Sequence, residues 1–111
     1  MLDFWFVADL SIILYYAMMR PIWTDNLQAD FVRVHGALME GYHRQHTLPA
    51  ASRAALPLFM QLREHALRAV SLRSVPEERR TERWWRYING ATDRIVSGAP
   101  PQGLDLAALG Y

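Results

Sequence analysis

The sequence predicts an all-α fold, a compact bundle of four to five helices that forms a single domain over residues 1–111. Three observations predict it. Apolar residues recur at three- and four-residue spacing, Pro and Gly separate the helical stretches, and no segment alternates strictly between polar and apolar residues as a strand would. The length suits one hydrophobic core, and a composition of 51% hydrophobic and 21% charged residues is typical of a globular chain.

The first helix is expected over about 4–19, where nearly every residue is apolar. This pattern predicts a helix enclosed on most sides, and Pro21 ends it. A signal peptide or membrane anchor is the alternative. The basic start of a signal peptide is missing, however, and the Asp9 carboxylate would cost about 2.5 to 3.5 kcal/mol in the middle of a bilayer. A helix buried in protein, with no membrane as partner, is the better interpretation.

Two further helical stretches are expected over about 25–46 and over about 49–56 with 57–73. Thr24, Asp25 and Asn26 supply capping oxygens for the first of them. Its apolar stripe consists of Leu27, Phe31, Val34, Leu38 and Tyr42. Pro57 lacks an N–H group, so it divides the next stretch into a short helix and a longer one. The longer helix is expected to bury Phe59, Leu62, Ala66 and Val70.

The last helix is expected over about 77–97, because Ser74 and Glu77 have the spacing of a capping box and Gly98 is a stop signal before two prolines. Its predicted buried row is Trp84, Ile88, Ala91 and Ile95, and its predicted wet residues are Arg79, Glu82, Arg83 and Arg86. The tail from 103 to 111 forms either a short turn or a frayed end.

Composition excludes several functional classes. All 12 basic residues are Arg, so neither a Schiff-base Lys nor a phosphate-binding Lys is present. The formal net charge is +1 and acidic residues lie near basic ones, which disfavours nucleic acid as a partner. The absence of Cys excludes thiolate chemistry and fits the cytoplasm. No Gly-rich phosphate loop, nucleophile elbow or HExxH motif occurs, so no catalytic residue is predicted.

Histidines and paired aromatic residues invite other site hypotheses. Glu40 and His43 have Glu-x-x-His spacing, with His46 one turn on, but a di-iron bundle needs that motif on two helices. A solvated helix end is therefore favoured, and no metal site is predicted. His35 and His65 are interpreted as core-edge residues rather than general bases. Two aromatic pairs, Trp84 with Trp85 and Tyr15 with Tyr16, favour core packing over a cage for a quaternary ammonium ligand.

Asp9 is the residue that packing explains least. A carboxylate among the apolar residues of the first helix must accept hydrogen bonds or lose its charge. The alternative is that one narrow stripe faces solvent, made of Trp5, Asp9, Ile12 and Tyr16.

A family resemblance enters through residues 4–17, with the sequence FWFVADLSIILYYA. This segment resembles the one that follows the metal-binding Asp in aminoglycoside-phosphotransferase and choline-kinase-like proteins, where an aromatic stretch ends in Asp-Leu-Ala. Asp9, Leu10 and Ser11 stand in that last position. Residues 31–42, 48–59 and 84–100 are similar, in the same order, to the family's Gly-Tyr helix, its helix with an internal Leu-Pro, and its final helix with a Gly-x-Pro exit. The resemblance covers nearly the whole chain.

The resemblance implies the C-terminal, acceptor-side helical part of an ATP-dependent small-molecule phosphotransferase. In the family, the nucleotide lobe, the His-x-Asp loop and the metal-binding Asp precede this segment, and none of them has a counterpart in this sequence. Asp3 does not supply the metal-binding Asp, because it lies too close to Asp9 for the family's loop. The chain is thus expected to be a fragment that is not catalytic on its own. ATP and Mg²⁺ are implied only for a full-length relative, and no cofactor is expected in this chain.

The resemblance also implies roles for individual residues. The family's Asp of Asp-Leu-Ala braces the catalytic loop, so Asp9 is expected to be a structural support whose carboxylate turns to water, pairs with an Arg or Tyr, or is satisfied by a second chain. Tyr16, His35 and Tyr42 are the candidate binding residues for a small-molecule acceptor. The expected partner is either the missing N-terminal part of the kinase fold or a second copy, in which case the chain is a helical homo-oligomerising interaction module.

Overall fold

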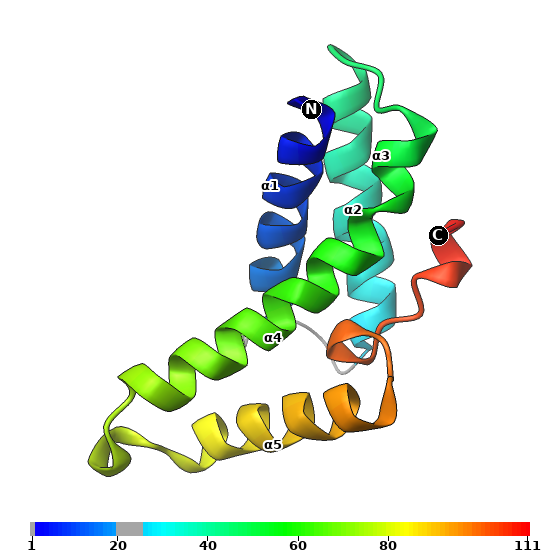
Figure 1. The fold of residues 1–111 in the computed structure, drawn as a ribbon. Coiled ribbons are helices and arrows are strands. Elements are labelled where there is room, and N and C mark those ends of the chain that lie inside the picture. The colour runs from blue at the N-terminus through cyan, green and yellow to red at the C-terminus, as the bar shows by residue number, and fades with distance from the viewer. Residues whose placement is uncertain (1, 20–25) are drawn as a thin grey trace.

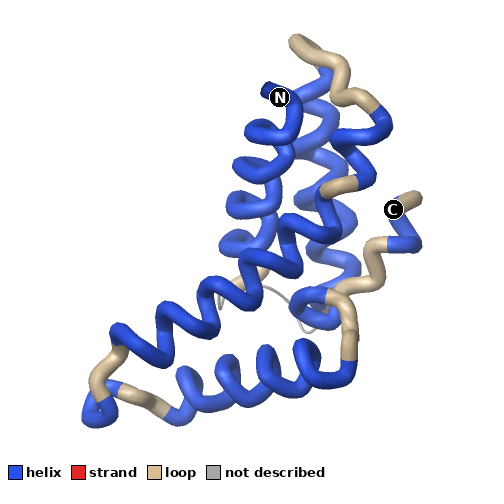
Figure 2. The backbone as a smooth tube through the Cα atoms, in the orientation of Figure 1, coloured by secondary structure: helices blue, strands red, loops and turns tan. Residues whose placement is uncertain are grey.

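The structure, a computed structural model, describes residues 2–19 and 26–111, with the side chains of the first helix described from Phe6 onward. Within these residues it contains helices and no strand, which confirms the all-α prediction (Figure 2). The four long helices have 16 to 19 residues: α1 (Leu2–Ala17), α2 (Leu27–His43), α4 (Leu56–Ser74) and α5 (Glu82–Ser97). Shorter elements are α3 (Ala50–Ala54) and the 3-10 turns η1 (Glu77–Arg79), η2 (Pro101–Gly103) and η3 (Ala107–Leu109).

The helices form one packed group and one projecting arm. Figure 1 shows α1, α2, α3 and the first half of α4 packed together, while the second half of α4 pairs with the antiparallel α5 and extends away from them. The molecule is accordingly elongated, with principal extents of 46 × 31 × 25 Å. The chain after α5 returns to α2, where the Gln28 side chain pairs with the backbone of Asp105 at 2.9 and 3.0 Å. The C-terminal tail is therefore docked rather than frayed.

The hydrophobic core lies where α1 crosses the first half of α4 and meets α2. Buried apolar side chains come from α1, α2, α4 and the docked tail, and the largest are Tyr15, Phe31, Leu14, Met60 and Leu104. The predicted stripe of α2 is confirmed: Phe31 is buried, and Leu27, Val34, Leu38 and Tyr42 pack against the core. Asn26 caps α2 by accepting a hydrogen bond from the backbone N–H of Ala29 at 3.0 Å, whereas Thr24 and Asp25 lie outside the described residues.

The predicted break at Pro57 is confirmed, since α3 ends at Ala54 and Pro57 lies in the first turn of α4. The predicted stripe of α4 is wrong at three of its four positions, and the fourth, Phe59, packs against the core. Leu56, Met60 and Glu64 are its buried residues, and Leu62, Ala66 and Val70 are exposed. The buried row contains a carboxylate, so the spacing of apolar residues alone predicts the wrong face of the helix.

The predicted start of the last helix at Glu77 is also wrong. Residues 77–79 form a separate 3-10 turn, and α5 begins at Glu82 with Thr81 as its cap; the Thr81 hydroxyl accepts a hydrogen bond from the N–H of Trp84 at 3.1 Å. Arg80 holds the connection, because its guanidinium donates to the carbonyls of Leu72 and Val75 at the end of α4. The stop at Gly98 is confirmed, and its φ of 72° is the left-handed conformation that favours glycine.

The predicted faces of α5 are confirmed in most positions. Ile88 and Ala91 are buried, and the wet residues are exposed; Trp84 and Ile95, which were expected in the buried row, are only half-buried.

The prediction that the first helix is enclosed on most sides is wrong. Phe6, Ile13 and Tyr16 are exposed on one face of α1, while Val7, Leu14 and Tyr15 are fully buried on another. The other helices cover this face only at its ends, where the Phe6 ring packs against Tyr42 of α2 and Tyr16 lies in a hollow that Leu67 of α4 also lines. Among the described residues, no helix combines the length and hydropathy that crossing a membrane requires.

Candidate functional site

A buried polar network joins α1, α4, α5 and η2, and Glu64 lies at its centre. Glu64 is only 2% exposed, although it is a carboxylate in the middle of α4. One of its oxygens, Oε1, accepts hydrogen bonds from Nε and Nη2 of Arg94 at 2.9 and 2.6 Å. The same oxygen accepts the Tyr15 hydroxyl at 3.1 Å. A buried carboxylate needs this degree of pairing, because leaving it unpaired away from water is costly.

Gln102 completes the network from the turn after α5. Its backbone N–H donates to Oε1 of Glu64 at 3.1 Å, and its side-chain amide donates to the carbonyl of Tyr15 at 2.9 Å. Gln102 has φ 56° and ψ 12°, a left-handed conformation that non-glycine residues seldom adopt. These two hydrogen bonds hold the residue in that conformation and tie the end of α5 to α1 and α4.

Two tyrosine hydroxyls connect the network to the surface. The hydroxyls of Tyr15 and Tyr87 lie 2.8 Å apart. Because Tyr15 donates to Glu64, Tyr87 is the donor to Tyr15. Burial raises the pKa of Tyr15 far above its ordinary value, and the Tyr87 hydroxyl and the Glu64 carboxylate raise it further. Burial likewise raises the pKa of Tyr87. Both groups are therefore neutral hydrogen-bond donors at physiological pH.

A cleft of about 340 Å³ opens beside this network, between the C-terminal end of α1 and α5. Its polar lining is Arg83, Arg86, Tyr87, Arg94 and Gln102, and its apolar lining is Met18, Met19 and Leu27. A second hollow of about 330 Å³ shares three of its lining residues with the cleft, namely Met19, Arg83 and Tyr87. The described lining of the cleft includes no carboxylate.

The three predicted acceptor-binding residues lie in different environments. Tyr16 lines the second hollow with Trp84 and Tyr87. Tyr42 packs edge-on against Phe6, with ring centroids 6.0 Å apart. Phe6 precedes Tyr16 by ten residues on α1, which is about 15 Å along a helix. Tyr16 and Tyr42 therefore lie near opposite ends of α1 and do not share one pocket.

His35 is a buried residue that fastens the tail of the chain. Its Nε2 lies 2.6 Å from the hydroxyl of Tyr111, and the Arg53 guanidinium lies 4.5 Å from the centre of the Tyr111 ring. Burial lowers the pKa of His35, and the charge of Arg53 lowers it further. This agrees with the prediction of a core-edge histidine with one hydrogen bond.

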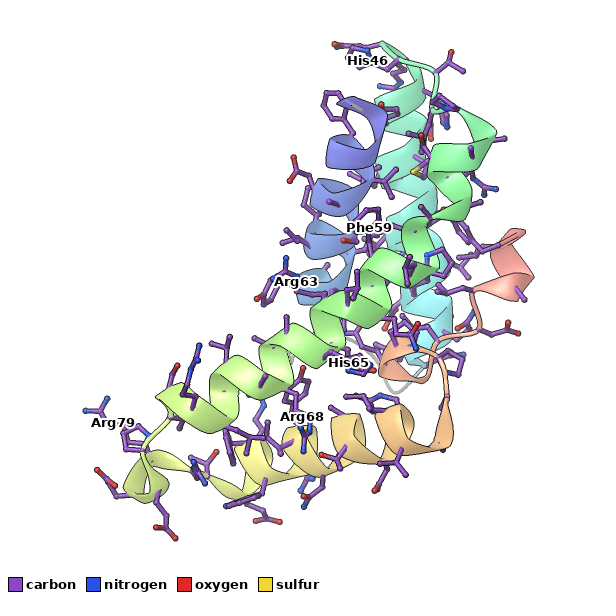
Figure 3. All side chains as sticks on the ribbon, viewed as in Figure 1. His46, Phe59, Arg63, His65, Arg68 and Arg79 are labelled. Carbon is purple, nitrogen blue, oxygen red and sulfur yellow. The ribbon has the colours of Figure 1, made fainter. Side chains whose placement is uncertain are left out.

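The other histidines are exposed, so the prediction that His65 lies at the edge of the core is wrong. Figure 3 shows His46 just after α2 and His65 on α4, in separate parts of the molecule. Glu40 pairs with Arg44 at 3.0 Å on the surface, and His46 lies against the Phe6 ring. Across 2–19 and 26–111, no three His, Asp or Glu side chains gather closely enough to hold a metal ion.

Asp9 lies on the exposed face of α1, between Phe6 and Ile13, so its carboxylate is turned to water. This was one of the outcomes expected for it. The proposed solvent-facing stripe is present in part: Asp9 and Tyr16 are exposed and Ile12 is half-buried, while the side chain of Trp5 lies outside the described residues.

The tryptophan pair of α5 already holds a cation from its own chain. The rings of Trp84 and Trp85 meet edge-on with centroids 4.8 Å apart, and the Arg80 guanidinium lies 4.8 and 5.6 Å from the two ring centres. This pair therefore orders the turn between α4 and α5.

The sequence did not predict the buried network, which consists of Tyr15, Glu64, Tyr87, Arg94 and Gln102. One signal was available: Glu64 continues the spacing of Leu56 and Met60, so it occupies a buried position of α4. Arg94, Tyr87 and Gln102 gave no local signal, since they meet Glu64 only in the folded chain. Comparison with protein-family models, with curated proteins and with solved structures found no match for this chain.

Proposed function

We propose that this chain is the C-terminal, acceptor-side helical part of an ATP-dependent phosphotransferase that acts on a hydroxyl group of a small molecule. On its own it is not catalytic. Nucleotide binding, the catalytic loop and the metal-binding carboxylates come from polypeptide that packs on it. The family resemblance of residues 4–17 motivates this proposal, and the surface of α1 supports it.

The outer face of α1 is the observation that carries the proposal. Three large side chains are exposed on it: Phe6 (43%), Ile13 (52%) and Tyr16 (42%). Asp9 lies among them with an exposed carboxylate. An apolar helix face with one hydrogen-bond acceptor in its middle suits a covering segment that offers apolar side chains and a few donors. By the resemblance, the catalytic loop of a kinase is such a segment.

The experiment supplies the missing parts. The chain is mixed with a polypeptide that carries the nucleotide lobe, catalytic loop and metal-binding strand of an aminoglycoside-phosphotransferase-like kinase and stops before its Asp-Leu-Ala helix. Phosphorylated products from a panel of hydroxyl compounds are measured by mass spectrometry. We expect phosphate transfer only when both polypeptides are present. Transfer should be lost with Ile13→Asp, on the outer face of α1, and retained with Leu62→Asp, an equally exposed residue on α4.

Two results would contradict the proposal. One is turnover of MgATP by the isolated chain, and the other is a complete lack of transfer by the mixture although the two polypeptides form a complex.

A second candidate function uses the same face. Without a kinase lobe, a second copy of the chain would cover the exposed side chains of Phe6, Ile13 and Tyr16. Size-exclusion chromatography with light scattering measures this directly. A dimer at micromolar concentration that Ile13→Asp dissociates and Leu62→Asp does not would favour this candidate. A monomer at that concentration would remove it.

A further inference from the structure

We propose that the cleft between the end of α1 and α5 is a binding site for a small organic anion, a carboxylate or phosphate monoester attached to an apolar body. The proposal rests on the charge and shape of the cleft, and it does not require the proposed phosphotransferase function.

The charge of the cleft comes from one face of α5. Arg83 and Arg86 are three residues apart, and Arg94 follows eleven residues after Arg83, so all three guanidinium groups share that face. Arg94 is neutralised by the buried Glu64 carboxylate at 2.6 Å. Arg83 and Arg86 are exposed. Arg86 pairs with the Glu82 carboxylate at 3.4 Å, and the Glu82 side chain is 90% exposed. A contact of this kind is weak in water, so Arg83 and Arg86 leave the cleft with positive charge to offer a ligand.

The chemistry of these groups selects the ligand. A guanidinium presents paired N–H donors that match the two oxygens of a carboxylate or the oxygens of a phosphate. Tyr87 lines the same cleft. Met18, Met19 and Leu27 form an apolar wall on the other side, which can cover the hydrocarbon part of the ligand. The volume of about 340 Å³ fits a small molecule and lies at the lower end of ordinary ligand sites.

The buried network gives this cleft a fixed back wall. Tyr87 is held by the Tyr15 hydroxyl at 2.8 Å, and Arg94 is held by two hydrogen bonds to Glu64. Gln102 is held by its bonds to Glu64 and Tyr15. These side chains need little further ordering when a ligand enters, which reduces the entropic cost of binding.

The test titrates the chain with hexanoate and with phenyl phosphate and follows the backbone amide signals by NMR in buffer with about 150 mM chloride. Hexanol and hexylamine are the neutral and cationic controls. We expect saturable shifts at Arg83 and Tyr87 with both anions, and a Kd of about 1 mM or tighter, which a ligand of about eight non-hydrogen atoms can supply. The controls should bind at least about tenfold more weakly.

The decisive variant is the double substitution Arg83→Ala with Arg86→Ala, which should weaken anion binding at least about tenfold. Its matched control, Arg73→Ala with Arg79→Ala, removes the same number of charges outside the cleft; Figure 3 shows Arg79 at the far tip of the arm. The double substitution Arg83→Gln with Arg86→Gln removes the charge but keeps a polar side chain of three carbons, and it should weaken anion binding in the same direction. Absence of shifts at the cleft, equal binding of hexanol, or equal weakening by the control pair would each overturn the proposal. Those results would leave the phosphate-transfer test of α1 unaffected.

Discussion

Two carboxylates in the middle of long helices have opposite environments in this molecule. Glu64 of α4 is buried and its Oε1 accepts four hydrogen bonds from three residues. Asp9 of α1 is exposed among apolar side chains. The chain pairs Glu64 with donors of its own, and it places Asp9 on a surface where only water or another polypeptide can satisfy it. The difference separates what this fold achieves by itself from what it leaves to a partner.

The largest effect is expected from Glu64→Gln. This substitution removes the charge that pairs with Arg94, a residue whose side chain is only 24% exposed. Breaking one partner of a buried ion pair costs about 3 to 5 kcal/mol, and the partial exposure of Arg94 favours the lower end. Urea unfolding followed by circular dichroism measures the change. Glu40→Gln is the control, because its ion pair with Arg44 is on the surface and should contribute less than about 1 kcal/mol. Equal stability of the two variants would mean that Glu64 is not the centre of the fold.

Tyr15→Phe should have the next largest effect. It removes the hydroxyl that donates to Glu64 and accepts from Tyr87, so the Glu64 carboxylate loses one of its four hydrogen bonds and the half-buried Tyr87 hydroxyl loses its acceptor. We expect a loss of about 1 to 2 kcal/mol in the free energy of unfolding. Tyr16→Phe is the neighbouring control, since Tyr16 is exposed, and it should change stability by less than about 0.5 kcal/mol. A neutral Tyr15→Phe variant would show that the hydroxyl bridge adds nothing to the network.

The pH dependence of stability should depend on His35, a buried histidine on α2. Burial lowers its pKa in the folded chain, so the unfolded chain binds more protons as the pH falls below about 6.5. The stability contributed by neutral His35 is complete above that pH and is lost as the pH falls through the lowered pKa of the folded state. Thermal unfolding between pH 5 and pH 8 measures this loss. His35→Gln should flatten the curve over this range, whereas His65→Gln, an exposed histidine, should leave it unchanged.

Sequence patterns predicted the helices well and the buried face of two of them poorly. The fold class, the break at Pro57, the Asn26 cap and the Gly98 stop follow from local chemistry, and the structure confirms them. The faces of α1 and α4 depend on which helices pack against them. For α4, apolar spacing favoured Leu62 and Val70, because the buried position 64 is a glutamate whose charge is neutralised by Arg94, thirty residues away. For α1, nearly uniform apolarity gave no means of telling the buried face from the outer one.

The same limits apply to the candidate site. The same reasoning placed His35 and His65 at the edge of the core; it is confirmed for His35 and wrong for His65, which is exposed because the stripe predicted beside it is not the buried face of α4. The cleft could not be predicted, because the sequence indicates only that Arg83 and Arg86 are solvent-exposed on α5. The cleft forms when folding brings Met18 and Leu27 near them. The predicted start of the last helix at Glu77 was wrong for a similar reason. Residues 77–79 form a turn that Arg80 holds by hydrogen bonds to the end of α4, and these contacts are not visible in the local sequence.

The smallest effect on stability is expected from Asp9→Asn, which tests the exposed member of the pair of carboxylates. Asp9 is exposed, so the substitution should change the free energy of unfolding by less than about 0.5 kcal/mol. Binding to the complementary kinase polypeptide is a separate measurement, by titration calorimetry. If Asp9 braces a loop through charge-assisted hydrogen bonds, Asn should weaken the complex by about 1.5 to 3 kcal/mol, while Glu40→Gln leaves it unchanged. A substitution at Asp9 that leaves the free energy of unfolding unchanged and weakens the complex would establish that the outer face of α1 binds another polypeptide. If Asp9→Asn instead destabilised the isolated chain as much as Glu64→Gln, the two carboxylates would share a structural role and the contrast drawn between them would be wrong.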